Sequence, residues 1–411
     1  MEDVHRVIEA VARDSYGRLV AYLCSRTRDV AGAEDALGEA LLAALTVWPR
    51  DGVPQTPEAW LLTTARRRLI DRARHMRVQA ESAMTLELIA EAAEETGSRE
   101  LFCDERLKLL FVCAHPAINP GVHTPLMLQT VLGLDAARIA QAFLVSPASM
   151  GQRLVRAKTK IRDTGIAFEI PDEHELPQRL DAVLDAIYVA YGSGWEDTVG
   201  VDPRRRGLSD EAIWLARVLV QQMPSEPEVR GLLALMLHCE ARRPARRTAN
   251  NQYIPLSEQD VRRWSKPMIA EAERELAAAA KHGRPGHFQL EAAIQSVHAE
   301  RAHSGHTDWG AITSFYENLV HMAPTLGAKI GHAAALAELN GAEAGLLLLS
   351  GIAPADVTTY QPYWAVRAHL LKRLAREPEA SDAFDRAIGL SEDDSVRRFL
   401  LERRRELRVA T

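Results

Sequence analysis

The chain has 411 residues, an apolar fraction of 47% and a formal net charge of −6, which suit a globular protein of about two to four domains. The negative charge excludes a uniformly basic nucleic-acid coat. Residues 1–165 nevertheless hold 21 Lys and Arg against 21 Asp and Glu, so the rest of the chain carries the whole acidic excess. Neither a signal-peptide pattern nor an apolar run of membrane-spanning length is found, and we expect a cytoplasmic protein. Four scattered cysteines without a C-x-x-C pair fit buried thiols in a reducing compartment.

The pattern of apolar residues predicts an all-α fold, because strand-like alternation is absent and Pro or Gly recurs at intervals suited to helix pairs. A first helix is expected over residues 4–25. A second, capped by Asp29, is expected over about 31–48. The proline-rich stretch 49–57 is expected to be an exposed loop. At its end, Thr56 is expected to cap a helix with Pro57 in the first position.

A dense basic run follows Trp60. Six arginines and a single acid, Asp71, stand between Arg66 and Arg77. Such a run exceeds what pairing within a protein explains, and a phosphate backbone is the obvious partner. The alternative is a solvated helix end whose cations favour the helix dipole, which explains one or two arginines. Residues 78–103 are acidic and predict a linker, although an acidic surface helix fits equally well.

Helices expected over 104–114 and 126–134 precede a predicted helix-turn-helix at 135–162. Ser146 can cap its second helix, with Pro147 in first position. That helix is expected to turn Leu154, Val155 and Ile161 inward. It is expected to leave these polar residues in solvent: Gln152, Arg153, Arg156, Lys158 and Lys160. Polar residues early and cations later suit a helix in a major groove, whereas the alternative is a plain helical hairpin with a basic face.

The order of these features resembles the extracytoplasmic-function sigma factors. Three stretches carry the resemblance: Ala33-Glu34-Asp35-Ala36 with Glu39, Pro57-Glu58-Ala59-Trp60-Leu61, and Leu69-Ile70-Asp71-Arg72. Stretches at 104–107, 113–117, 142–145 and 152–158 are similar to one subgroup, which has a fused helical C-terminal domain of tetratricopeptide character. In one departure, Gly38 stands near the place where members usually carry Gln in the polymerase-binding helix.

The resemblance implies a promoter-specificity subunit of bacterial RNA polymerase, with core polymerase and promoter DNA as partners. The residues implied to contact the clamp helices of the largest polymerase subunit are Asp35, Leu37, Glu39 and Leu41. Those implied to contact the downstream element and the melted strand are Arg50, Asp51, Gln55, Arg66, Arg67, Arg68, Arg72 and Arg74. Those implied to contact the upstream element are Ser146, Ser149, Gln152, Arg153, Arg156, Lys158 and Lys160.

Four segments are expected on this basis: a sigma-2 promoter-melting domain (1–77), an acidic linker (78–103), a sigma-4 helix-turn-helix domain (104–165) and a helical, tetratricopeptide-like domain (166–411). The last contains residues at the large-small-small-aromatic-small spacing of a repeat: Trp364, Ala368, Ala380, Phe384 and Ala387. Stacked repeats leave a concave surface for a peptide or another domain. Its acidic excess suits either a cover for the arginine clusters, through an intramolecular contact, or a platform for a separate regulator.

No nucleophile elbow, phosphate loop or paired-carboxylate signature occurs, so neither catalysis nor a cofactor is expected. His298, His303 and His306 lack the spacing and the companion ligands of a metal site, and none is expected. Two other classes stay open: a helix-turn-helix activator whose repeat domain senses a ligand or protein, and an adaptor whose repeats bind a protein. The basic run beside Trp60 favours the sigma factor, because a duplex-only activator needs no arginines suited to single strands.

Overall fold

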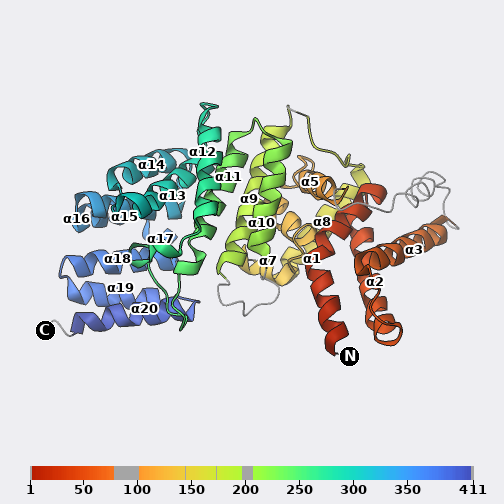
Figure 1. Ribbon diagram of the computed structural model, residues 1–411, viewed down its shortest axis with the longest axis horizontal. Helices are drawn as coiled ribbons and strands as arrows, with labels where there is room; N and C mark the ends of the chain where they lie inside the picture. The colour runs from red at the N-terminus through yellow and green to blue at the C-terminus, as the bar shows by residue number, and fades with distance from the viewer. Residues whose placement is uncertain (1, 78–100, 144, 173, 197–206, 409–411) are drawn as a thin grey trace. The chain divides into compact units, whose positions relative to one another are not determined.

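The structure, a computed structural model, describes residues 2–77, 101–143, 145–172, 174–196 and 207–408 (Figure 1). Over these residues it consists of α-helices and short 3-10 turns, with no strand beyond one isolated bridge between Arg247 and Tyr253. The prediction of an all-α fold is confirmed. The acidic linker expected over 78–103 lies outside the described residues as far as residue 100.

The chain divides into two compact units, Met1–Val218 and Leu219–Thr411. The division falls within α10 (Leu208–Gln222), so α9 (Leu176–Glu196) and most of α10 belong to the first unit. The sequence had suggested a C-terminal domain that begins at residue 166. The limits of the expected domains therefore stay a prediction.

Three helices open the first unit: α1 (Glu2–Thr27), α2 (Val30–Asp51) and α3 (Pro57–Arg77). α2 begins as predicted, because the Asp29 carboxylate accepts a hydrogen bond from the backbone N–H of Gly32 at 3.1 Å. The buried face of α2 is rich in alanine, at positions 33, 36, 40 and 44, all fully buried. Such small side chains allow α1 and α3 to pack closely against α2.

Four helices follow: α5 (Leu101–Cys113), α6 (Pro120–Thr130), α7 (Ala136–Ala142) and α8 (Pro147–Thr164). α6 begins six residues before the expected position, since Asn119 caps the backbone N–H of Gly121 at 2.9 Å and Pro120 takes the first position. A capping residue followed by proline is a helix start, which the neighbouring prolines had concealed. α1 crosses the end of α6 closely: a Cβ atom at Gly17 would lie 1.8 Å from the carbonyl oxygen of Val131, so only glycine fits there.

α9 and α10 are tied to the helices before the helix-turn-helix. α9 packs against α5 and α6. The Arg106 side chain of α5 is buried, forms an ion pair with Glu211 of α10, and lies over the ring of Trp214 at 4.2 Å. An arginine held by a carboxylate and an aromatic face makes a strong link between helices. α9 and most of α10 are therefore part of the first unit's core.

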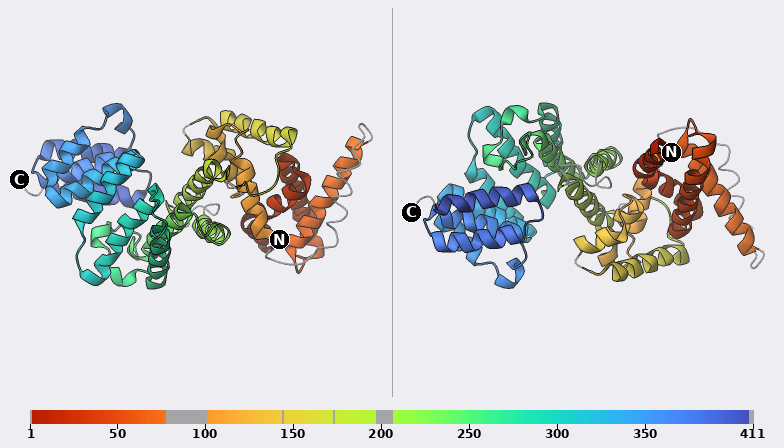
Figure 2. Two further views of the ribbon diagram at one scale, coloured as in Figure 1. Left: turned by 90° about the horizontal axis from the view of Figure 1, so that it is seen from above. Right: turned by 90° about the horizontal axis from the view of Figure 1, so that it is seen from below.

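The second unit is a succession of helices, most of which pack on the helices one or two places away in the chain. They are α11 (Pro227–Ala241), α12 (Lys266–Ala280), α13 (His287–Ser304), α14 (Trp309–Met322), α15 (Leu326–Asn340), α16 (Ala342–Ser350), α17 (Pro354–Val357), α18 (Gln361–Arg373), α19 (Glu377–Gly389) and α20 (Asp394–Arg405). Four 3-10 turns lie at Arg243–Ala245, Leu256–Glu258, Val261–Arg263 and Glu406–Arg408. α18, α19 and α20 lie side by side at the blue end of the chain (Figure 2). Packing between successive neighbours is the pattern of repeat proteins.

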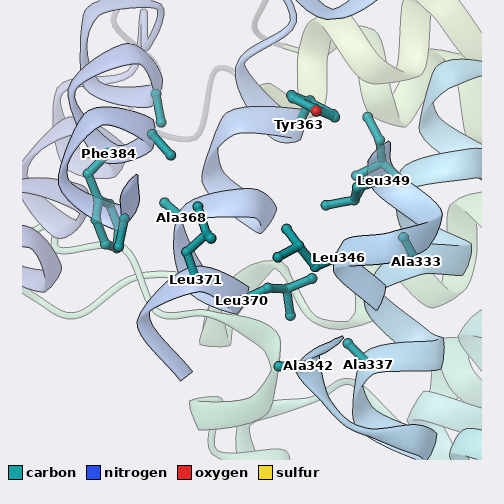
Figure 3. Close-up of a cluster of buried hydrophobic side chains, with 14 of the residues drawn as sticks. Ala333, Ala337, Ala342, Leu346, Leu349, Tyr363, Ala368, Leu370, Leu371 and Phe384 are labelled. Carbon is teal, nitrogen blue, oxygen red and sulfur yellow. The ribbon is translucent and has the colours of Figure 1, made fainter. Parts of the chain in front are cut away.

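Phe384 occupies the position in this core that its spacing predicts. It is 3% exposed, and Ala368, Ala380 and Ala387 around it are fully buried. Figure 3 shows Phe384 of α19 near Ala368 and Leu371 of α18, with Leu370 on the other side of α18 directed toward Leu346 of α16. Small residues on α18 and α19 thus leave room for one aromatic ring.

The Phe384→Ala variant should lose about 3–5 kcal/mol of stability in the second unit, because the ring leaves a cavity that its helical neighbours cannot fill. Thermal or denaturant unfolding of the full chain, followed by hydrogen exchange in α18–α20, would measure the loss. Leu347→Ala is the matched control, since Leu347 is 77% exposed, and it should change the stability by less than about 0.5 kcal/mol. Equal losses in the two variants would contradict the assignment.

Candidate nucleic-acid interface

The turn between α7 and α8 is built from a capped helix start. The Ser146 hydroxyl oxygen accepts a hydrogen bond from the backbone N–H of Ser149 at 3.2 Å, and Pro147 is the first helical residue. The predicted cap is confirmed. Ser146 is exposed, although its hydroxyl oxygen is engaged by this cap, and Ser149 is half-buried.

The outer face of α8 is polar and basic. Four of the side chains expected in solvent are exposed: Gln152, Arg153, Arg156 and Lys160. The buried stripe consists of Met150, Leu154, Ala157 and Ile161, spaced by three or four residues. Val155 was expected in the core but is 63% exposed, because it follows Leu154 by one residue and so lies about 100° around the helix from the stripe.

Lys158 differs most from its expected position. It was expected in solvent among the cations for the upstream element, but it is 8% exposed and forms an ion pair with Glu34 of α2. The reason is its place beside Ala157 on the buried side of α8, where α8 packs against α2. In this structure Lys158 therefore cannot contact DNA phosphates, and that part of the prediction is wrong.

The pair of Lys158 and Glu34 is costly to bury. Burial raises the pKa of the Glu34 carboxyl above its ordinary value, although the charge and hydrogen bond of Lys158 act in the opposite direction. The second carboxylate oxygen of Glu34 is buried, without a hydrogen-bond partner among the described residues. Neither group is tolerated in this place without the other. The pair therefore makes the contact between α2 and α8 specific.

A second set of charges connects α2 and α3 at the surface. Arg72 lies 3.1 Å from Asp35 and 2.7 Å from Glu39, and Arg68 lies 3.6 Å from Glu39. The four side chains are 39–65% exposed. The acids expected to bind polymerase and two of the arginines expected to bind DNA thus face each other. Exposed pairs of this kind contribute about 0–1 kcal/mol each, so a binding partner could displace them easily.

The apolar residues expected beside these acids need one correction. Leu37 is fully buried and cannot touch a partner, and Leu41 is half-buried. Leu42, which the sequence reading missed, is 65% exposed. It follows Asp35 by seven residues and Glu39 by three, which places the three side chains on one face of α2. The same spacing, applied to the sequence, would have identified it.

The connection between α2 and α3 is shorter than the loop predicted over residues 49–57. α2 continues through Pro49 to Asp51, so the non-helical connection to α3 covers only residues 52–56. Trp48 and Trp60 lie edge to face with their ring centroids 5.5 Å apart and hold the two helices together at this point. Arg50, Asp51 and Gln55 remain exposed around the connection.

The arginines of α3 fall into different environments. Arg66 lies over the ring of Tyr22 at 4.8 Å and donates a hydrogen bond to its hydroxyl, and burial lowers the pKa of its guanidinium. Arg67 is exposed and forms no ion pair with any described residue. The Arg74 side chain lies outside the described part. Contacts within the chain thus account for some of these arginines. From the sequence, we had expected such contacts to be too few to explain the basic run.

The described residues contain no group of three His, Cys, Asp or Glu side chains that could hold a metal ion. His303 and His306 are exposed, whereas the His298 ring meets Trp309 at 5.5 Å. Cys24 and Cys113 are buried as expected, and burial raises the pKa of both thiols, that of Cys113 to about 12. Among the residues that the structure describes, no helix is long and apolar enough to cross a membrane.

Residues 11–78 match sigma-70 region 2. The match covers most of α1 and all of α2 and α3, and thus the acids and arginines described above. It indicates a sigma-70 family factor. A sigma-70 region 2 implies binding to core RNA polymerase and promoter DNA, and it supports a role as a sigma factor in transcription initiation.

Residues 179–280 match a family of unknown function (DUF6596). The chain is also 38% identical over 386 residues to uncharacterized protein R00370 of Rhizobium meliloti (strain 1021), which covers 92% of this chain and 90% of that protein. The chain belongs to the same family as this relative. No solved structure matches it. The sigma-70 region is therefore fused to a C-terminal part of unassigned role.

The Glu34→Gln variant should loosen α8 from α2, because it leaves the buried Lys158 ammonium without its counter-charge at a cost of about 3 kcal/mol. Hydrogen exchange of the full chain should then be faster in peptides from α8. The double variant Glu34→Gln with Lys158→Met, which removes both charges, should return the exchange close to that of the original chain. Slow exchange in the single variant would show that the pair does not hold this contact.

Proposed function

We propose that this sigma-70 family factor is of the extracytoplasmic-function type and that its helix-turn-helix reads an upstream promoter element. The observation that carries the proposal is the exposed polar and basic face of α8 in the same compact unit as the sigma-70 region 2. A factor of this type needs one domain to melt DNA and a second to read duplex. The first unit supplies a candidate for each.

Core polymerase would bind the exposed face of α2. Asp35 and Glu39 offer carboxylates to the clamp helices of the largest subunit, and Leu42 adds an apolar contact beside them. Polymerase would compete with Arg68 and Arg72 for these carboxylates. Because the exposed pairs are weak, their exchange costs little and frees two arginines next to the DNA path.

The melted strand would pass the connection at 52–56 and the outer side of α3. Arg50, Asp51 and Gln55 surround the connection and would hold an unstacked base. Arg67 is directly available for phosphates, whereas Arg68 and Arg72 become available only when their acids bind elsewhere. Arg66 would serve mainly to fix Tyr22 and α1.

The upstream duplex would meet the exposed face of α8. Gln152 lies early in the helix and can reach a base edge, while Arg153, Arg156 and Lys160 would contact the backbone or bases around it. Such a factor acts in the cytoplasm, where polymerase and DNA are found. The second unit would regulate it, either by covering basic residues of the first unit or by docking a separate regulator.

Run-off transcription with purified core polymerase on a library of genomic fragments tests the proposal. The full chain should direct transcription from a limited set of fragments, and Asp35→Lys with Glu39→Lys should abolish both transcription and polymerase binding. A truncation after Gln222 keeps α9, which packs on α5 and α6, and α10, whose Glu211 pairs with Arg106 of α5, and would reveal the effect of the second unit. Duplex binding without any polymerase-dependent transcript would instead identify a helix-turn-helix activator.

Arg67→Gln should weaken promoter opening and reduce the slope of log affinity for the melted strand against log salt by about 0.7, the effect of one lost phosphate contact. Stopped-flow or filter-binding measurements on a pre-melted promoter between 50 and 200 mM salt would give the slope. Lys281→Gln in the second unit is the charge-matched control, because Lys281 is also exposed. An unchanged slope in a folded Arg67→Gln variant would remove Arg67 from the interface.

Gln152→Ala should change which upstream sequences are preferred, by about 1–3 kcal/mol at one base pair, because a base-edge contact is lost. Lys160 lies about two turns further along α8, where it would contact the phosphate backbone. Lys160→Ala should therefore weaken binding to all sequences alike. Selection from a randomised upstream element would compare the two profiles. If both variants keep the original preference, α8 docks on the duplex by another face.

A further inference from the structure

Val155 is an exposed apolar residue in a polar and basic helix. Its side chain is 63% exposed, and it does not belong to the stripe with which α8 packs on its neighbours. Valine is also a poorer helix former than alanine, lysine or arginine, because its branched side chain is restricted by the preceding turn. Single exposed apolar residues are common in proteins. What distinguishes Val155 is its position among the other exposed residues of α8.

Val155 lies at the centre of the exposed face of α8. Four exposed residues follow one another at spacings of four, three and four: Ala148, Gln152, Val155 and Thr159. Since one turn of a helix takes about 3.6 residues, their side chains form one row along the helix. The row lies on the side of α8 opposite the buried stripe. None of the four side chains is charged, so we call them the uncharged row.

The cations of the exposed face lie beside the uncharged row. Arg153, Arg156 and Lys160 are exposed, and none of them forms an ion pair with any described residue. The one acid of α8 is Asp163, which pairs with Arg162 at 3.1 Å. In duplex DNA, the base edges of the major groove lie between two phosphate backbones. An uncharged row with available cations beside it is complementary to this surface.

The uncharged row restricts which base pairs the centre of α8 can read. Guanine is most often read in the major groove by an arginine or lysine, and the row contains neither. Glutamine can form two hydrogen bonds with adenine, and thymine presents a methyl group that apolar side chains contact. Gln152 and Val155 therefore suit A·T pairs. They lie about 4.5 Å apart along the helix axis, which brings their contacts onto the same or neighbouring base pairs.

We propose that Val155 contacts the C5 methyl group of a thymine in the upstream element, next to the base that Gln152 reads. This contact requires α8 in the major groove and so rests on the proposed function, to which it adds a residue that determines specificity. It removes apolar surface of both partners from water. It favours thymine, because the other three bases present no methyl group in the major groove.

Replacement of thymine by deoxyuridine tests the contact, because it removes this methyl group and keeps the base pair. The preferred upstream element is first selected from a randomised library with the full chain and core polymerase. Each thymine of the selected element is then replaced in turn, and the affinity of the complex is measured by filter binding. For the original chain, one of these replacements should weaken binding about fourfold, the effect of one methyl group that is no longer removed from water.

Val155→Ala tests whether Val155 is the residue that contacts this methyl group. The variant should bind the thymine element at least about fourfold more weakly than the original chain, and it should no longer distinguish thymine from deoxyuridine at that position. It should remain folded, because alanine is the better helix former at an exposed position. Leu347→Ala is the matched control in α16, since Leu347 is also exposed. It should distinguish the two bases as the original chain does.

Failure of this contact and failure of the proposed function give different results. If no upstream sequence is selected, both fail. If a sequence is selected and Gln152→Ala changes the preference, α8 reads duplex DNA as proposed. The role of Val155 is then overturned by a selected element without thymine, by an original chain that tolerates every deoxyuridine, or by a Val155→Ala variant that still distinguishes the two bases.

Discussion

The buried ion pair of Lys158 and Glu34 is the interaction on which the first unit depends. It joins two residues 124 positions apart, with side chains 9% and 15% exposed. Charges so far from water are stable only while each keeps its partner, so the pair admits one arrangement of α8 on α2. One side of the helix-turn-helix therefore packs against the sigma-70 region 2. The opposite edge, which carries Gln152, Arg153 and Arg156, is left to solvent.

α2 meets three different demands with three of its faces. Its alanine face packs closely on α1 and α3, Glu34 meets α8, and its outer face presents Asp35, Glu39 and Leu42. The ion pairs described between the outer face and α3 are exposed and weak, whereas the alanine face is fully buried and the Glu34 side chain is only 15% exposed. The buried contacts of α2 therefore stabilise the fold, while a binding partner can replace its exposed ion pairs at little cost.

In the second unit, as in α2, small side chains allow helices to pack closely. Small residues on α18 and α19 let Phe384 fill the core of one helix pair, and the stack continues through neighbour contacts. The segment 246–258 then uses Arg247, Tyr253 and Glu258 to bind across the helices instead of packing into them. A cavity lined by residues of both remains between the segment and the helices.

The sequence by itself determined the all-α fold, the caps at Asp29 and Ser146, and the place of Phe384, because these depend on local spacing and on side chains near in the chain. The resemblance to sigma factors rested on short motifs and agrees with the match over residues 11–78. Only the tertiary structure decided the burial of Lys158, the pairing of Arg72 with Asp35 and Glu39, and the attachment of α9 and α10 to the first unit. Each depends on which distant helix supplies the opposite charge or ring, and helical periodicity contains no information about that neighbour.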